Sequence, residues 1–287
     1  MRMSKIYGEP LTLDQIIELA LAEDIGTGDC TSLSTVPAHT MGRARLLVKE
    51  AGVLSGMEVA AKVFHRVDPN IIMHQQLKDG DHIKPGDIAF TVEGHSVSLL
   101  QAERLALNFM QLMSGIATYT AQYVEALNGL GTKVIDTRKT TPLLRALEKL
   151  AVVHGGGANH RKGLYDMILI KDNHVDFAGG IRQAIEGANA YIKDNALSLP
   201  IEIEVRNATE LEQVLAVGGV TRIMLDNFSP DDLKLAVDRI DRRFETEASG
   251  GITLKTIRNF AETGVDYISV GALTHQIKSI DLSLKAF

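Results

Sequence analysis

Hydrophobic positions in the second half of the chain follow two alternating periods. Stretches with helical spacing, such as 180–194, 208–218, 230–240 and 253–264, lie between shorter apolar runs. Strand–helix alternation sustained in this way predicts parallel βαβ units. The six runs that we expect to be strands are KVIDTR (133–138), DMILIKDN (166–173), IEIEVRN (201–207), RIMLDN (222–227), FETEAS (244–249) and YISVGA (267–272).

The ends of these runs help to choose between a closed barrel and an open, doubly wound sheet. No GxGxxG follows the first strand, and GxxxxGK[ST] does not occur. Barrel enzymes build their sites from the C-terminal ends of many strands, whereas an open sheet concentrates its site at one switch point. We therefore favour a barrel, with six clear strands rather than eight. A different polar group ends each strand: Arg138-Lys139, Lys171-Asp172-Asn173, Glu204, Asp226-Asn227, Ser249-Gly250-Gly251 and Gly271.

The first part of the chain has a different pattern. Residues 11–23 have amphipathic helical spacing, and a run of turn formers follows at 24–32. Short β-like pieces between about residues 42 and 93 predict a small sheet built largely from hairpins, interrupted by one helix. A long helix is expected from about residue 99 to 127. We expect an α+β domain over 1–110 and a barrel domain over 111–287, whose C-terminal tail packs back on the first domain.

Composition narrows the class of protein. The chain has 287 residues, of which 45% are hydrophobic and 23% charged, as in an ordinary globular protein. Its net charge of −6 argues against a general binder of nucleic acid or anionic membranes. The single cysteine, Cys30, excludes an intrachain disulfide and fits a reducing compartment. Residues 1–10 lack the apolar core of a signal peptide, so a cytoplasmic protein is expected.

Positive charge gathers in one window of this acidic chain. Residues 136–171 hold seven Lys or Arg against three Asp or Glu, a net charge of +4. Arg138, Lys139 and Lys171 end apolar strands, where charged side chains need a reason to be, and we interpret them as anion-binding residues. The glycine-rich loop 154–166 adds His160 and Arg161 beside them. The remaining charges of a predicted helix, namely Arg145, Glu148 and Lys149, are expected to form a solvated face.

Two glycine loops and two carboxylates complete the candidate site. SGGI (249–252) precedes a predicted helix, and SVGAL (269–273) ends the last strand, a pairing typical of a phosphate cradle. Glu204 and Asp226 should lie on neighbouring strands at similar height, where they could hold Mg²⁺, bind ribose hydroxyls or act as acid and base. These features predict a substrate with several negative charges, such as a sugar phosphate, and leave the reaction type open.

At these residues the chain resembles the quinolinate phosphoribosyltransferase family. The matching segments are LAEDIGTGDCTS, AERLALNFMQLMSGIAT, DTRKTTPLLRALEK, GGGANHRKGLYDMILIKDNH, IEIEV, IMLDN, EASGGIT and TGVDYISVGALTH. The resemblance implies an N-terminal open-faced sandwich joined to an incomplete α/β barrel of six to seven strands. It implies transfer of a phosphoribosyl group from phosphoribosyl pyrophosphate to quinolinate with Mg²⁺, giving nicotinate mononucleotide, pyrophosphate and CO₂ in NAD biosynthesis.

The resemblance also implies a homodimer in which Arg104 reaches into the site of the neighbouring subunit. Lys139, Lys171, Glu204 and Asp226 would act in catalysis, and Glu204 and Asp226 would be the candidate ligands of Mg²⁺. The full set of expected substrate-binding residues is Arg104, Thr137, Arg138, Lys139, His160, Arg161, Lys171, Glu204, Asp226, Ser249, Gly250, Gly251 and Gly271.

Three other functions fit parts of the pattern. A pyrophosphorylase-like protein of molybdate-transport operons would share the fold but not the dicarboxylate substrate, and the complete set of cations argues against it. A Schiff-base aldolase or decarboxylase would use Lys171 as its nucleophile. A phosphate-sensing module would bind ligand without turnover.

Overall fold

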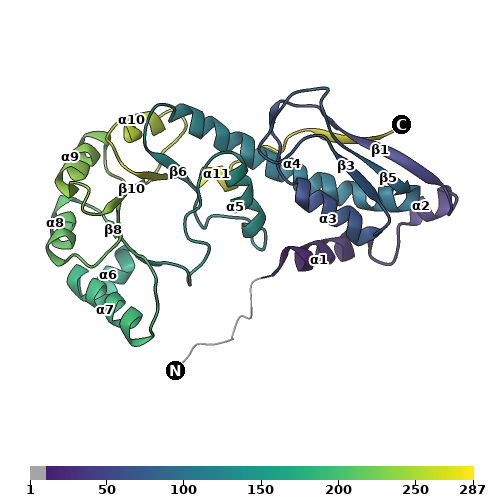
Figure 1. Ribbon diagram of the computed structural model, residues 1–287. Coiled ribbons are helices and arrows are strands. Elements are labelled where there is room, and N and C mark those ends of the chain that lie inside the picture. Colours follow the sequence, from purple (N-terminus) through teal and green to yellow (C-terminus); the bar gives the residue numbers. More distant parts are fainter. Residues whose placement is uncertain (1–10) are drawn as a thin grey trace. The chain divides into compact units, whose positions relative to one another are not determined.

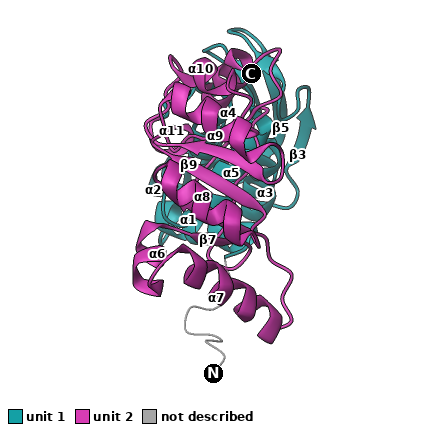
Figure 2. Ribbon diagram, turned by 90° about the vertical axis from the view of Figure 1, so that its left-hand side faces the viewer, with its two compact units in different colours: residues 1–118, 141–155, 277–287 teal, residues 119–140, 156–276 magenta. Residues whose placement is uncertain are grey.

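The computed structural model describes residues 11–287, so the expectation that residues 1–10 carry no signal peptide lies outside the described part. The chain forms two compact units, which Figure 2 colours separately. The first contains the described residues up to Thr118, together with Thr141–Gly155 and Ile277–Phe287. The second contains Tyr119–Thr140 and Gly156–Gln276. The chain therefore enters the second unit at residue 119 and returns to the first unit twice.

The first unit contains an antiparallel sheet with strand order β12-β1-β5-β3. The expectation of hairpins is wrong, because β1 pairs with β5 and with β12 from the far end of the chain. The segments between these strands leave the sheet: β2 and β4 pair with each other, and a helix intervenes. The strands are β1 (Met41–Val48), β2 (Gly52–Val53), β3 (Ile72–Gln75), β4 (His82–Ile83), β5 (Ile88–His95) and β12 (Leu282–Ala286).

Five helices belong wholly or partly to the first unit. A capping box between Thr12 and Gln15 begins α1, and the Phe64 ring of α3 packs edge-on against Phe90 of β5 at 5.9 Å between centroids. The helix α2 lies where turn formers predicted a loop, because the Asp29 side chain accepts a hydrogen bond from the Ser32 N–H. The helices are α1 (Leu13–Ile25), α2 (Cys30–Thr35), α3 (Met57–Val67), α4 (Ser96–Ala126) and α5 (Arg145–His154).

The charged residues of α5 do not form the expected solvated face. Glu148 and Lys149 are buried, and only Arg145 is partly exposed. The Glu148 carboxylate accepts a hydrogen bond from the Thr141 N–H at 3.1 Å, and burial raises the pKa of this carboxyl. Two of these three charged side chains are therefore buried rather than exposed to solvent.

The second unit is an incomplete α/β barrel. Its six strands are parallel and follow the order β6-β11-β10-β9-β8-β7, so the first strand pairs with the last while β6 and β7 do not pair. A doubly wound sheet would reverse its order at a switch point, whereas this sheet curves round with helices outside it (Figure 1). The predicted strands are confirmed as β6 (Lys133–Ile135), β7 (Ile168–Ile170), β8 (Ile201–Val205), β9 (Arg222–Asp226), β10 (Glu245–Ser249) and β11 (Tyr267–Ser269).

The helices around the barrel begin at local caps. Asn207 caps α8 and Ser229 caps α9, which also has a proline at its first position. The glycine loop after β10 does not lead directly into a helix, contrary to the expectation. A turn closed by Thr253 and Thr256 lies between the loop and the next helix. The helices are α6 (Asp172–Ala178), α7 (Ile181–Asp194), α8 (Ala208–Val217), α9 (Pro230–Ile240), α10 (Ile257–Ala261) and α11 (Ala272–His275). Among residues 11–287, no helix has the length and apolar character needed to cross a membrane.

Candidate active site

The second unit contains a cavity of about 600 Å³ at the C-terminal ends of its strands. This is the position at which barrel enzymes place their sites. Twelve of the thirteen residues expected to bind substrate line it: Thr137, Arg138, Lys139, His160, Arg161, Lys171, Glu204, Asp226, Ser249, Gly250, Gly251 and Gly271. The thirteenth, Arg104, lies exposed on α4 in the first unit, and its side chain forms no hydrogen bond or ion pair with another residue of the described range.

Guanidinium groups are brought together on one part of the cavity lining. Burial, and then the nearby charge of Arg138, lower the pKa of Arg161. One end of the Arg161 side chain is fixed, because its Nη1 donates to the Met167 carbonyl at 3.2 Å. Cations held close together in this way favour an anion between them, and guanidinium forks match carboxylates in geometry.

The segment after β6 presents Lys139 to the same cavity. The Lys139 N–H donates to Thr137 Oγ1 at 3.0 Å, and the Lys139 carbonyl accepts from Thr274 Oγ1 at 2.7 Å. A Cβ on Gly271 would lie 3.0 Å from Lys139 Cδ, so the missing side chain leaves room for the lysine. The backbone around Lys139 is therefore held from two directions.

The glycine loop after β10, which we expect to be a phosphate cradle, leaves no room for a side chain at residue 250. Gly250 has φ +100°, and a Cβ there would come within 2.2 Å of Asn227 Oδ1 and 2.9 Å of the Asn227 backbone nitrogen. Gly251 follows with φ +60°. Only glycine fits at residue 250 without displacing Asn227. Asn227 itself lines the cavity, although it was not among the expected substrate-binding residues. The loop offers bare backbone to a ligand oxygen.

The two expected carboxylates lie on neighbouring strands but not at the same height. Glu204 pairs in register with Met224, so Asp226 lies one pleat further toward the C-terminal end of β9. The buried Glu204 accepts from Lys171 Nζ at 2.7 Å, and Asp226 Oδ2 accepts from Asn227 Nδ2 at 2.6 Å. Carboxylate oxygens are the donor type that Mg²⁺ takes, so Glu204 and Asp226 fit this ion.

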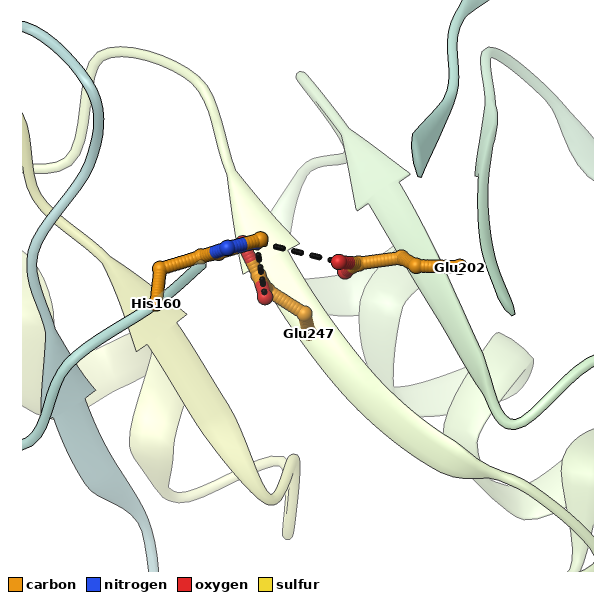
Figure 3. A group of neighbouring side chains, drawn as sticks. All are labelled: His160, Glu202 and Glu247. Atoms are coloured by element: carbon orange, nitrogen blue, oxygen red, sulfur yellow. Dashed lines mark ion pairs between the residues drawn. The ribbon is translucent and has the colours of Figure 1, made fainter. Parts of the chain in front are cut away.

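His160 also belongs to a buried cluster whose other members, Glu202 and Glu247, were not predicted from the sequence (Figure 3). Of the three, His160 and Glu247 line the cavity. His160 Nε2 is 3.0 Å from Glu202 Oε2 and 3.5 Å from Glu247 Oε2. Burial and the nearby Glu202 raise the pKa of Glu247 to about 8, and burial raises the pKa of Glu202. Arg222 also contacts Glu247, with Nη1 at 3.1 Å from Oε2.

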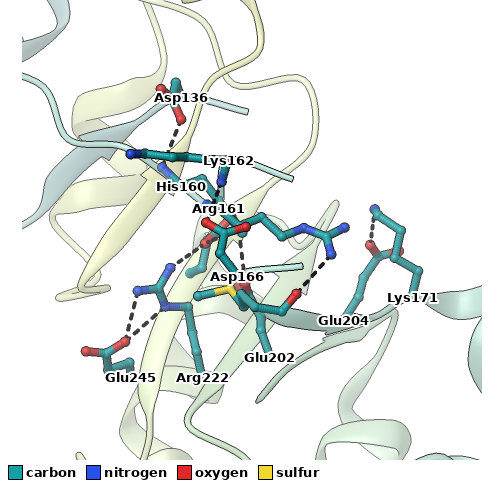
Figure 4. Close-up of polar contacts among 12 residues, drawn as sticks. Asp136, His160, Arg161, Lys162, Asp166, Lys171, Glu202, Glu204, Arg222 and Glu245 are labelled. Carbon is teal, nitrogen blue, oxygen red and sulfur yellow. Dashed lines mark hydrogen bonds and ion pairs between the residues drawn. The ribbon is translucent and has the colours of Figure 1, made fainter. Parts of the chain in front are cut away.

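A sequence signal for this cluster exists in the alternation of the strands. Side chains two residues apart share a face, so Glu202 faces the same way as Glu204, and Glu247 the same way as Ser249. Both glutamates are therefore one pleat below a residue that the strand ends identify. Figure 4 shows the resulting polar layer, with Arg222 between the glutamates of β8 and β10.

Comparison with known proteins places the chain in a family. The model of the quinolinate phosphoribosyl transferase N-terminal domain matches residues 29–114, and that of the C-terminal domain matches residues 116–285. A tobacco (Nicotiana tabacum) quinolinate phosphoribosyltransferase [decarboxylating] 1b is 44% identical over 95% of this chain and 82% of its own length. A probable nicotinate-nucleotide pyrophosphorylase [carboxylating] of Bacillus subtilis is 41% identical over 96% of this chain and 93% of its own.

Solved structures agree with the sequence relatives. The crystal structure of NadC from Streptococcus pyogenes has a TM-score of 0.91 and 42% identity, covering 97% of this chain and 98% of its own. The match extends over both units, including the incomplete barrel that holds the cavity. The chain belongs to the quinolinate phosphoribosyltransferase family.

Proposed function

We propose that this protein transfers the phosphoribosyl group of phosphoribosyl pyrophosphate to quinolinate and releases CO₂, making nicotinate mononucleotide and pyrophosphate for NAD biosynthesis. The observation that carries the proposal is one cavity lined by strand-end cations, two carboxylates and a bare glycine loop. These groups suit, in turn, a dicarboxylate, a ribose and a phosphate. The named activities of the relatives in tobacco and Bacillus subtilis support the same reaction.

Each part of the cavity has a role in this reaction. Arg138 and Arg161 grip the carboxylates of quinolinate, while Lys139 and Lys171, with His160 nearby, face the phosphates of the donor. The 5-phosphate lies in the cradle formed by Ser249, Gly250, Gly251 and Gly271. Glu204 and Asp226 face the ribose hydroxyls and stabilise positive charge that develops at the anomeric carbon.

The bonds change in two steps. The ring nitrogen of quinolinate forms a bond to C1 of the ribose as the bond to pyrophosphate breaks, and the electron pair leaves with pyrophosphate. The ring is now positively charged, so it stabilises the electron pair left when the adjacent carboxylate departs as CO₂. A proton from water takes the place of the carboxylate. Positioning and charge stabilisation are sufficient, which agrees with the absence of an obvious nucleophile among the lining residues.

Mg²⁺, held by Asp226 and Glu204 together with donor oxygens, would neutralise charge on the departing pyrophosphate.

Arg104 is exposed and forms no ion pair within the described range, as expected of a residue that meets its ligand in a second subunit. We accordingly infer a homodimer in which Arg104 completes the quinolinate site of its partner.

The single cysteine and acidic charge are consistent with a cytoplasmic enzyme that binds neither nucleic acid nor membrane, although relatives in plants include mitochondrial and chloroplastic proteins.

A Schiff-base lyase is the second candidate, and the surroundings of Lys171 argue against it. Nucleophilic lysines are desolvated or lie beside another cation. The Lys171 side chain is 48% exposed and pairs with the Glu204 carboxylate at 2.7 Å. Borohydride added during turnover should therefore trap no substrate on Lys171.

The direct test is to supply quinolinate, phosphoribosyl pyrophosphate and Mg²⁺, and to measure CO₂ and nicotinate mononucleotide. Lys139→Met should lower kcat/KM by about 100-fold, because a fixed charge facing the donor is removed. Lys162→Met is the matched control, since Lys162 is exposed and does not line the cavity; it should change kcat/KM by less than about two-fold. Binding of both substrates without product would leave only a ligand-binding module.

A further inference from the structure

His160 is held by the protein at three points. Its backbone N–H donates to the buried Asp136 Oδ1 at 2.8 Å. Its ring Nδ1 accepts from the Arg161 backbone N–H at 2.6 Å. Its ring Nε2 lies between Glu202 Oε2 and Glu247 Oε2, at 3.0 and 3.5 Å, aligned with neither as in a linear hydrogen bond. The ring is therefore oriented from both nitrogens.

These contacts select one protonation pattern of the ring. A nitrogen that accepts a hydrogen bond carries no proton, so Nδ1 of His160 is bare and the proton of the neutral ring lies on Nε2. Nε2 faces the two carboxylates, which are the acceptors that such a proton needs. Carboxylates beside an imidazole commonly fix its tautomer and the direction of the ring in this way.

We propose that Glu202 and Glu247 are positioning residues, which hold His160 as the Nε2–H tautomer so that its Nδ1 anchors Arg161 against the substrate dicarboxylate. The role of quinolinate in this statement rests on the proposed function. Arg161 is fixed at its backbone by His160 and at its guanidinium by the Met167 carbonyl. Because Nδ1 of His160 accepts from the Arg161 N–H and Nε2 faces two buried carboxylates, His160 positions Arg161 and does not deliver a proton to the substrate.

Arg222 also contacts one member of the pair, Glu247. Its Nη1 lies 3.1 Å from Glu247 Oε2, its Nη2 lies 2.9 Å from Glu245 Oε2, and its guanidinium stacks 4.0 Å from the Tyr267 ring centroid. The three groups His160, Glu202 and Glu247 also have the ligand types of a metal site, with ligand atoms within 4.8 Å of one another. The guanidinium in contact with Glu247 opposes a second cation there, which favours the positioning role.

The test reads the tautomer directly. ¹⁵N-histidine NMR of the full-length protein distinguishes an unprotonated ring nitrogen from a protonated one, and His160→Gln assigns the signals. We expect the signal of an unprotonated Nδ1 in the wild type. This signal should disappear in the double variant Glu202→Met, Glu247→Met. If the double variant does not fold, Glu202→Met alone removes the nearer acceptor. Glu202→Gln retains an acceptor oxygen and should largely keep the wild-type signals.

Binding and kinetics give the second arm. The Met variants should raise the KM and the calorimetric Kd for quinolinate by about 10- to 100-fold, and change the KM for phosphoribosyl pyrophosphate by less than about two-fold. Glu245→Met is the control, because Glu245 contacts Arg222 without being an ion-pair partner of His160; it should preserve the tautomer and the quinolinate KM.

Three results would overturn the inference. They are a proton on Nδ1 of His160 in the wild type, Met variants with unchanged tautomer and quinolinate affinity, or one equivalent of metal that the wild type binds and the double variant loses. If the wild type shows the expected tautomer but makes no nicotinate mononucleotide, the proposed function fails while the assignment of Glu202 and Glu247 to His160 stands.

Discussion

Replacing Gly250 by alanine adds one methyl group, which should have two effects. The first is backbone strain, because φ is +100° and a residue with a Cβ pays about 1–2 kcal/mol in the left-handed region. The second is a collision: the new Cβ would lie 2.2 Å from Asn227 Oδ1, so the loop or Asn227 must move by about 1 Å to reach ordinary contact. A misplacement of this size in a catalytic site lowers the rate by about 100-fold.

Gly86→Ala is the matched control for strain. Gly86 has φ +97°, but nothing lies within 4 Å of its added Cβ. Both variants should lose about 1–2 kcal/mol of unfolding free energy in urea titrations, with a further loss in Gly250→Ala from the collision. Only Gly250→Ala should lose about 100-fold in kcat/KM for phosphoribosyl pyrophosphate. If Gly250→Ala keeps kcat/KM within about three-fold of wild type, the glycine loop is not the cradle of the 5-phosphate.

Three further predictions concern charge and assembly. The folded state raises the pKa of Glu247 from 4.5 to about 8. The stability that the protonated Glu247 contributes is therefore lost as pH rises from about 4.5 to 8, by up to about 1.4 kcal/mol per pH unit. In urea titrations the unfolding free energy of Glu247→Gln should depend less on pH than that of the wild type, and an equal pH dependence would contradict the shift. Arg104→Ala and Lys139→Ala, each inactive alone, should together recover roughly a quarter of wild-type activity after subunit exchange, since half of the dimers then have one intact site; verified exchange without recovery would rule out the shared site. Asp226→Asn should raise the Mg²⁺ concentration needed for half-maximal activity about 10-fold, while an unchanged requirement would remove Asp226 from the metal site.

The cavity lining can be predicted from the sequence because strand ends leave a local signal. An apolar, β-branched run that stops at Lys171 or Glu204 identifies both the strand and the residue at its tip. Parallel strands bring all such tips to one edge, so residues far apart in the chain share one cavity. A positive window and glycine pairs then give the sign of the ligand, while the substrate itself came from the resemblance.

The features that could not be predicted depend on contacts between distant segments. Strand alternation puts Glu202 and Glu247 on the same face as Glu204 and Ser249, but it does not identify the buried histidine that they contact. The pairing of β1 (Met41–Val48) with β12 (Leu282–Ala286) has no local signal, and proximity in the chain favoured hairpins instead. The burial of Glu148 likewise depends on the partner that Thr141 supplies from outside the helix.

The pairing of β1 with β12 has a consequence for how the protein is made. During synthesis, β1 emerges from the ribosome long before residues 282–286, so the first unit lacks one neighbour for β1 until the last residues appear. The barrel strands, by contrast, are all available by residue 269. Although it comes first in the sequence, the first unit should therefore be completed last, and a nascent chain stalled before residue 282 should remain sensitive to protease near β1.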